Sequence, residues 1–262
     1  MVFLRSLAFN VFFYVNTTFW VLALVPTFVL PKSVFWRGVA AWSRTNRWGL
    51  VAIGGVAVEI RGLENLPKGG ALVASKHQST FETVSLIDYF VEPTFVMKRE
   101  LQRIPIFGWY TIKGEQIAVD RSAGRTALID MTERAKVVAA RGRPILIYPE
   151  GTRRPAGAEP HYKHGIAHLY ANLGVPLVPV ALNSGLFWGR HDFFRHPGTL
   201  VVEFLPAIAA NLDPEEVYAA MQEAIETASD RLIAEALAAP NPPPLPAAGQ
   251  AYLARRSTAG RS

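Results

Sequence analysis

The sequence predicts an α/β fold with a largely parallel central sheet flanked by helices, preceded by an N-terminal membrane-associated helical hairpin. Short apolar runs of strand length alternate with longer helical stretches, an order typical of βαβ units. An uncharged apolar stretch occupies residues 6–31, ahead of these runs. Polar residues directly follow several of the runs, where open α/β sheets bind ligands. We therefore divide the chain into membrane-associated helices at 1–55, an α/β domain at 56–239 and a disordered tail at 240–262.

Composition sets the broad class of protein. The chain has 262 residues, half of them hydrophobic, which is enough for one well-packed domain with an appendage. The absence of cysteine excludes disulfides, thiolate metal sites and a cysteine nucleophile. A formal charge of +6 favours anionic partners such as phospholipid head groups or phosphorylated substrates. Nucleic acid is disfavoured, because the basic residues are scattered and no nucleic-acid-binding motif accompanies them.

The apolar stretch at 6–31 allows three interpretations. It is long enough to cross a bilayer as one helix, since about 20 apolar residues suffice, but Asn10, Asn16 and Pro26 interrupt it. A cleaved signal peptide requires small residues at a cleavage site, and the sequence ALVP at 23–26 is a poor one. The third interpretation is a helical hairpin lying in one leaflet.

We favour the hairpin, with its turn between Pro26 and Pro31. Its second arm would run over residues 33–53, where tryptophans alternate with arginines. Indole rings and cationic tips suit the head-group region of a membrane. Whether the segment spans the bilayer or lies in it stays open at this point, but all interpretations place the rest of the chain beside lipid.

The body of the chain predicts seven strands and four long helices. An alternating segment at 56–61 predicts a half-exposed strand, and short apolar runs predict buried ones. These runs lie at 71–75, 94–97, 117–119, 145–148 and 177–182, with a further strand, a candidate for antiparallel pairing, at 199–205. The predicted helices cover 80–89, 125–140, 165–172 and 214–238. From residue 240 the chain becomes proline-rich and then small and arginine-dotted, which predicts disorder.

His77 and Glu82 are the most informative pair in the chain. They follow the apolar run at 71–75, and an imidazole beside a carboxylate is a general base with its orienting partner. Residues five apart on a helix point about 140° away from each other, so His77 must lie in the loop before the helix and Glu82 in its first turn. Ser79 or Thr80 could cap that helix, and nearby backbone amides could face a developing oxyanion. The alternative is a purely structural pair.

Two further polar groups follow predicted strands. Asp120 and Arg121 come after the strand at 117–119, and a loop with Glu150 and Arg153 comes after the strand at 145–148. Carboxyl ends of parallel strands meet at one edge of a sheet, so these groups are expected to gather around His77. We expect Asp120 to pair with Arg121.

The chain resembles the glycerophospholipid acyltransferases, most closely the bacterial 1-acylglycerol-3-phosphate acyltransferases. The resemblance covers about residues 56–205 and rests on four ordered blocks: HQSTFE at 77–82, GEQIAVDR at 114–121, YPEGTR at 148–153 and VPLVPV at 175–180. The segments at 98–101 and 105–109 are similar to the family's connecting region. The chain departs from the family at Glu82, where the family usually carries Asp.

The resemblance implies transfer of a fatty acyl group from an acyl thioester to the sn-2 hydroxyl of 1-acylglycerol-3-phosphate, giving phosphatidic acid. His77 and Glu82 would be catalytic. Candidate phosphate-binding residues are Arg153, Arg121 and Lys98, and the candidate substrate loop is Glu150, Gly151 and Thr152. We expect Glu150 to steer an arginine or a substrate hydroxyl.

The implied partners are a lysophospholipid, membrane lipid and an acyl thioester carried by coenzyme A or acyl carrier protein, with no cofactor besides this co-substrate. The expected location is the cytoplasmic face of the inner membrane. Two alternatives stay open: an acyltransferase for another lysolipid, for example a lyso-ornithine lipid, or an inactive membrane-binding homologue. A lipid hydrolase is disfavoured because no serine or cysteine nucleophile is in evidence. A metal site at His161, His164 and His168 is also disfavoured, since the zinc-binding pattern HExxH is missing there.

Overall fold

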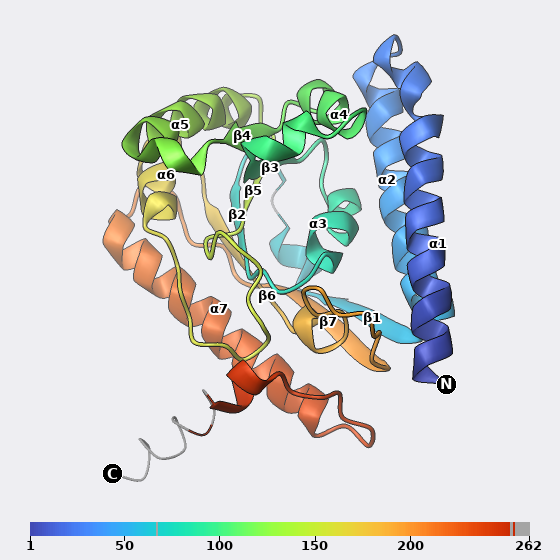
Figure 1. Cartoon of the computed structure of the whole chain (residues 1–262). Helices are drawn as coiled ribbons and strands as arrows, with labels where there is room; N and C mark the ends of the chain where they lie inside the picture. The colour runs from blue at the N-terminus through green and yellow to red at the C-terminus, as the bar shows by residue number, and fades with distance from the viewer. Residues whose placement is uncertain (67, 252–253, 255–262) are drawn as a thin grey trace, which may run out of the picture.

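A seven-stranded sheet forms the centre of the molecule (Figure 1), in a computed structural model that describes residues 1–66, 68–251 and 254. Its order is β1-β7-β6-β2-β5-β3-β4, and every neighbouring pair is parallel except β6–β7. The predicted fold class and the antiparallel last strand are confirmed. The strands are β1 (Val56–Arg61), β2 (Leu72–Ser75), β3 (Thr94–Lys98), β4 (Ile117–Val119), β5 (Ile145–Ile147), β6 (Leu177–Leu182) and β7 (Gly198–Phe204).

Helices cover both faces of the sheet (Figure 1). One face packs against α5 (Gly124–Ala140), α6 (Gly165–Leu173) and α7 (Pro214–Leu237), and the other lies towards α1 (Val2–Ala23), α2 (Lys32–Gly49) and α3 (Phe81–Ser85). Side chains along β2 alternate between the two resulting apolar clusters. In β2, Val73 joins the cluster with Phe81, whereas Leu72 and Ala74 join the cluster with Met221 of α7. The central strands β2, β5 and β6 are therefore buried on both sides, which explains their continuous apolar runs, whereas β1 is half-exposed as predicted.

Helices α1 and α2 form the expected hairpin. A 3-10 turn (Val25–Phe28) joins them, and Pro31 precedes α2, so the turn lies at the predicted prolines. Polar side chains hold the two arms together: Asn16 Nδ2 donates to Thr45 Oγ1 and to Asn46 Oδ1, both at 3.1 Å. Asn16, one of the two asparagines that interrupt the apolar stretch, is therefore satisfied by the second arm, whereas Asn10 Nδ2 donates to the Phe193 carbonyl at 3.0 Å.

Arg47 and Asp88 attach the hairpin to the α/β domain. The Arg47 guanidinium makes two hydrogen bonds of 2.8 Å to the Asp88 carboxylate, and Ser43 Oγ donates to the same carboxylate at 2.7 Å. The Asp88 side chain is only 5% exposed, so this is a nearly buried, bidentate ion pair.

Asp88→Asn is expected to lower the free energy of unfolding by about 3 kcal/mol, because it leaves the Arg47 charge partly buried without its partner. Urea unfolding of the detergent-solubilised protein measures this. The exposed pair of Asp130 and Arg134 supplies the control: Asp130→Asn should cost less than about 1 kcal/mol. Equal effects of the two substitutions would contradict the buried attachment.

One predicted helix is shorter in the structure, and one helix was not predicted. The helix expected at 80–89 ends at Ser85 and continues as a 3-10 turn (Ile87–Tyr89), because the Asp88 side chain is drawn to α2. Helix α4 (Phe107–Lys113) was not predicted; it is too short for a helical period to stand out.

The tail expected to be disordered from residue 240 is partly ordered. Leu245 packs against the main core cluster, and the amides of Gly249 and Gln250 close a turn on the Pro246 carbonyl. The prediction was wrong for this segment because apolar contact with the domain outweighs its composition. Residues 252–253 and 255–262 of the tail lie outside the described residues.

Candidate active site

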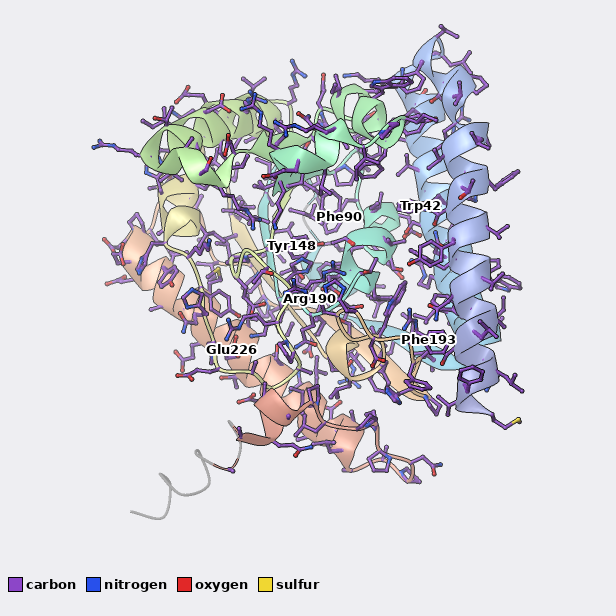
Figure 2. All side chains as sticks on the ribbon, viewed as in Figure 1. Trp42, Phe90, Tyr148, Arg190, Phe193 and Glu226 are labelled. Carbon is purple, nitrogen blue, oxygen red and sulfur yellow. The ribbon has the colours of Figure 1, made fainter. Side chains whose placement is uncertain are left out.

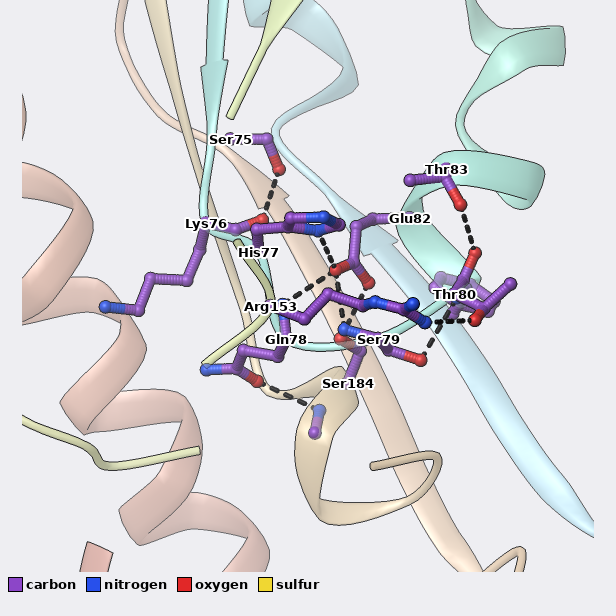
Figure 3. A network of polar contacts seen from close by, with 12 residues as sticks. Ser75, Lys76, His77, Gln78, Ser79, Thr80, Glu82, Thr83, Arg153 and Ser184 are labelled. Carbon is purple, nitrogen blue, oxygen red and sulfur yellow. Dashed lines mark hydrogen bonds and ion pairs between the residues drawn. The ribbon is translucent and has the colours of Figure 1, made fainter. Parts of the chain in front are cut away.

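His77 and Glu82 meet at the carboxyl end of β2 (Figure 3). The distance between His77 Nδ1 and Glu82 Oε1 is 2.9 Å, and His77 lies in the loop while Glu82 lies in the first turn of α3, as predicted. Because Nδ1 is engaged by the carboxylate, Nε2 is the nitrogen left to exchange a proton with a ligand.

The Glu82 carboxylate is fully buried and fully hydrogen-bonded. Its Oε1 also accepts the backbone N–H groups of Gln78 and Ser79, each at 2.7 Å. Its Oε2 accepts the Ser184 hydroxyl at 2.9 Å. These donors fix the side chain, so the extra methylene of Glu relative to Asp is accommodated.

These contacts correct one expectation about the backbone amides. The amides of Gln78 and Ser79 serve Glu82 and are therefore not oxyanion donors. Of the two expected capping residues, Ser79 accepts the Phe81 amide at 3.0 Å, whereas Thr80 Oγ1 accepts Arg153 instead.

Tyr148 and Glu150 hold His77 from the β5 side. The Tyr148 ring stacks on the imidazole with 4.1 Å between centroids and 22° between planes. Burial, with the Glu82 charge nearby, raises the pKa of the Tyr148 hydroxyl well above its ordinary value, so it stays protonated. Glu150 Oε2 accepts the His77 backbone N–H at 2.9 Å. Glu150 is only 1% exposed, and among the described residues its carboxylate contacts the His77 amide and Lys76 and not an arginine.

Several arginines surround the loop that follows β5. Arg153 Nη1 donates to Thr80 Oγ1 at 2.7 Å, and Arg121 donates to the Gly151 carbonyl. Arg190 lies beside the same loop, 3.4 Å from Thr152 Oγ1 (Figure 2). Gly151 has a φ of +69°, a backbone conformation that glycine adopts most readily. In the part of the chain that the structure describes, no ion pair engages these three arginines, so their charges are available to an anion.

Two predicted residues lie apart from this group. Lys98 is exposed at the end of β3, and no hydrogen bond or ion pair among the described residues joins it to His77 or Arg153. Asp120 pairs with Arg99, at 3.6 Å, and not with Arg121 as expected. Its side chain also accepts the Ser122 amide at 3.0 Å, so it caps a turn after β4.

The histidines at 161, 164 and 168 do not converge. His164 stacks on Tyr218, with 4.3 Å between ring centroids, and lies 3.8 Å from Glu215. Across the described residues, no group of three or more His, Cys, Asp or Glu side chains is placed to hold a metal ion.

Sequence reasoning missed three contributors to the site: Ser184, Arg190 and Lys76. Ser184 lies two residues after the end of β6, so the same strand-end rule that found His77 could have found it. Arg190 lies in an irregular loop with no local pattern. Lys76 precedes His77 and was not singled out, although its Nζ lies 3.2 Å from Glu150 Oε1.

The comparisons with known proteins agree with this geometry. A family model described as Acyltransferase matches residues 57–183. The chain is 35% identical over 208 residues to a 1-acyl-sn-glycerol-3-phosphate acyltransferase of Pseudomonas aeruginosa, covering 79% of this chain and 81% of that one. It is 30% identical to the enzyme of the same name from Limnanthes alba, covering 59% of this chain and 55% of the plant protein.

A solved structure shares the fold. The crystal structure of the 1-acyl-sn-glycerophosphate acyltransferase PlsC from Thermotoga maritima superimposes with a TM-score of 0.70, covering 88% of this chain and 98% of that one at 23% identity. His77, Glu82, Glu150 and Arg153 all lie within the range that the family model matches.

Proposed function

This chain belongs to the family of 1-acyl-sn-glycerol-3-phosphate acyltransferases, and we propose that it uses acyl-CoA or acyl-ACP to acylate the sn-2 hydroxyl of 1-acylglycerol-3-phosphate, giving phosphatidic acid. The observation that carries the proposal is the 2.9 Å contact between His77 and Glu82 at the sheet edge, next to a loop with arginines free to bind an anion. This arrangement supplies a general base and a phosphate site side by side.

His77 acts first as base and then as acid. Its Nε2 takes the proton from the acceptor hydroxyl as that oxygen attacks the thioester carbonyl, forming a C–O bond. The tetrahedral intermediate collapses with cleavage of the C–S bond, and the imidazolium returns the proton to the departing thiolate. Glu82 holds the imidazole in one tautomer and stabilises the imidazolium. The acceptor hydroxyl thus stands where a serine protease has its nucleophile, so no serine or cysteine of this chain is required.

Arg153 binds the phosphate of the acceptor. Its guanidinium is anchored to Thr80, three residues after His77, which fixes the phosphate relative to the base. A planar guanidinium suits bidentate contact with phosphate oxygens. Arg121 and Arg190, on two sides of the Gly151 loop, add charge around it.

Arg153→Gln is expected to raise the KM for lysophosphatidate by about ten- to a hundredfold, because it removes a hydrogen bond to a charged group. The value of kcat should change much less, since the His77–Glu82 contact is intact. Steady-state assays over a range of lysophosphatidate concentrations measure both constants. Arg134→Gln, on the exposed face of α5, is the matched control and should leave both unchanged. An unchanged KM in Arg153→Gln would argue for an acceptor without a phosphate.

The hairpin docks the enzyme on lipid. Among the helices in the described residues, α1 is the one that is long and apolar enough to cross a membrane. It exposes a stripe of apolar side chains, each between 56% and 64% exposed: Val11, Val15, Phe19 and Leu22. Because Asn16 is committed to α2, we propose that the hairpin lies in one leaflet instead of spanning the bilayer. Trp109 of α4, 59% exposed and in ring contact with Phe28, extends this surface at the turn. The proposed location is the cytoplasmic face of the inner membrane.

Val15→Asp with Phe19→Asp is expected to weaken binding to anionic phospholipid vesicles more than tenfold, because two charges replace side chains that enter lipid. Vesicle sedimentation measures the bound fraction, and circular dichroism confirms that the helices still form. Leu212→Asp, at a residue 50% exposed just before α7 and on the opposite side of the sheet, should leave binding unchanged. Equal binding by the double variant and the wild type would contradict lipid docking through α1.

One assay tests the function directly. Purified protein is supplied with acyl-CoA or acyl-ACP as donor and with lysophosphatidate or another lysolipid, including lyso-ornithine lipid, as acceptor. We expect phosphatidate as the main product and a clear preference for the phosphate-bearing acceptor. Faster acylation of a lysolipid that lacks the phosphate would overturn the assignment of the acceptor. Comparison of the rates with acyl-CoA and with acyl-ACP identifies which thioester is the donor.

A further inference from the structure

Lys76, the residue next to the proposed base, carries a deeply buried charge. Its side chain is 3% exposed and extends away from His77 towards α7 (Figure 3). Its Nζ lies 2.5 Å from Glu226 Oε1 and 3.2 Å from Glu150 Oε1. A buried ammonium costs several kcal/mol unless it is paired, so these two carboxylates are what allow Lys76 to lie there.

Glu226 brings α7 into this cluster. Glu226 lies in the middle of that helix (Figure 2), 150 residues from Lys76 in sequence. Its Oε1 also accepts the Tyr162 hydroxyl at 2.5 Å, and the Lys76 ammonium lies 5.4 Å from the centre of the Tyr162 ring. Helix α7 is beyond residues 57–183, the range of the family model, so the motifs that identify the family do not include this carboxylate.

The cluster is connected to His77 through Glu150 and the backbone. Glu150 binds Lys76 with one carboxylate oxygen and accepts the His77 N–H with the other, at 2.9 Å. The backbone of Lys76 is fixed as well, since its N–H donates to the Val180 carbonyl at 3.0 Å. The His77 carbonyl accepts the Arg154 N–H at 2.8 Å. The loop that carries the base is thus held by the ion pair of Lys76 and Glu150, and the Lys76 ammonium also pairs with Glu226.

The charges of Lys76, Glu150 and Glu226 depend on one another because they lie close together with little exposure to water. Desolvation raises the pKa of Glu150, and the Lys76 charge opposes that rise. One ammonium faces two carboxylates, so loss of Lys76 leaves the buried Glu150 and the partly buried Glu226 side by side without a counter-charge. Loss of the Glu226 charge lets Lys76 move towards Glu150, and Glu150 shifts relative to the His77 amide.

We propose that Glu226 of α7 is a positioning residue for acyl transfer: through Lys76 and Glu150 it fixes the loop that presents His77 to the acceptor hydroxyl. The inference rests on the proposed function, since it concerns the same base. It assigns α7 a part in the reaction geometry besides its packing on the sheet. Displacement of a base by about 1 Å costs on the order of a hundredfold in rate, which sets the size of the expected effect.

The test measures kcat and KM for three variants, Glu226→Gln, Lys76→Met and the double variant Lys76→Met with Glu226→Gln. We expect kcat to fall about tenfold in Glu226→Gln and about a hundredfold in Lys76→Met. The double variant should recover about tenfold over Lys76→Met, since it removes one of the two unpaired carboxylates. The KM for lysophosphatidate should stay within about twofold throughout, because none of these variants removes Arg153 or its contact with Thr80.

Controls separate positioning from loss of folding. Glu223→Gln, at an exposed site three residues earlier on α7, should match the wild type. All assays are run well below the lowest thermal midpoint, recorded by circular dichroism. Wild-type kcat in folded Glu226→Gln, or a double variant no faster than Lys76→Met, would overturn the inference. If Lys76→Met does not fold, Glu226→Gln and Tyr162→Phe, which removes only the hydroxyl donated to Glu226, decide it. Failure of the proposed function is distinguishable, since the wild type itself would then form no phosphatidate.

Discussion

Replacement of His77 by alanine is expected to lower kcat for phosphatidate formation by at least about 10⁴-fold. The imidazole is the group that takes the proton from the acceptor hydroxyl and returns it to the thiolate, and removing the base from comparable acyl-transfer sites costs this much. No second base takes over in the residues that the structure describes around it, since Tyr148 stays protonated and the Glu82 carboxylate is buried behind the ring. The KM for lysophosphatidate should change little, because Arg153 keeps its contact with Thr80.

Two measurements separate a loss of chemistry in His77→Ala from a loss of folding. Single-turnover formation of phosphatidate from a labelled acyl thioester follows chemistry directly, and thermal unfolding checks that the variant is folded. His168→Ala, on the exposed face of α6, is the matched histidine control and should retain full activity. More than about a tenth of the wild-type rate in folded His77→Ala would exclude His77 as the base.

The strand-end rule explains how much of the site could be predicted from sequence. Parallel strands bring their carboxyl ends to one edge, so residues after β2 and β5 had to meet there, and His77, Glu82 and Arg153 do. The rule does not say which way a side chain turns within a loop. Glu150 satisfies it, yet its carboxylate turns inwards to Lys76 and the His77 amide.

Contacts between distant elements set the limit of prediction. Glu226 lies on a helix that also carries exposed glutamates, and nothing in its local sequence distinguishes it from the exposed Glu223. Only the packing of α7 on the sheet places it 2.5 Å from Lys76. The same holds for Asp88, which ends α3 early because it binds a guanidinium 41 residues away. Periodicity reports which face of a helix is apolar, and it carries no information about which polar group lies opposite.

The N-terminal hairpin shows where sequence reasoning and structure support each other. The asparagine and prolines that argued against a simple span are the residues that bind the second arm and form the turn. A polar group in an apolar helix is costly unless it finds a partner, and Asn16 finds one in the second arm. The identity of that partner, Thr45 and Asn46, required the structure.

Glu82→Gln is expected to lower kcat by about 10³- to 10⁴-fold while Glu82→Asp loses only about ten- to a hundredfold. The amide keeps the size of the side chain but has no charge to stabilise the imidazolium. It also has one accepting atom where Glu82 has two, which together accept His77, Gln78, Ser79 and Ser184. Aspartate keeps the charge and is shorter by one methylene, so it misplaces the imidazole without removing its counter-ion.

The ranking of kcat for Glu, Asp and Gln at position 82 separates a catalytic carboxylate from a structural one. A charge that stabilises the imidazolium predicts Glu above Asp above Gln in kcat, whereas a hydrogen-bonding scaffold predicts that Gln, the isostere, exceeds the shorter Asp. Ser184→Ala is the matched control, because it removes one hydrogen bond to Glu82 Oε2 and leaves the contact of Oε1 with His77 intact. It should cost no more than about tenfold, in line with loss of one hydrogen bond to a charged group. Faster turnover by Glu82→Gln than by Glu82→Asp would mean that the carboxylate serves the fold of the loop and not the chemistry of acyl transfer. Negligible turnover by both variants and by the wild type would instead favour an inactive membrane-binding homologue.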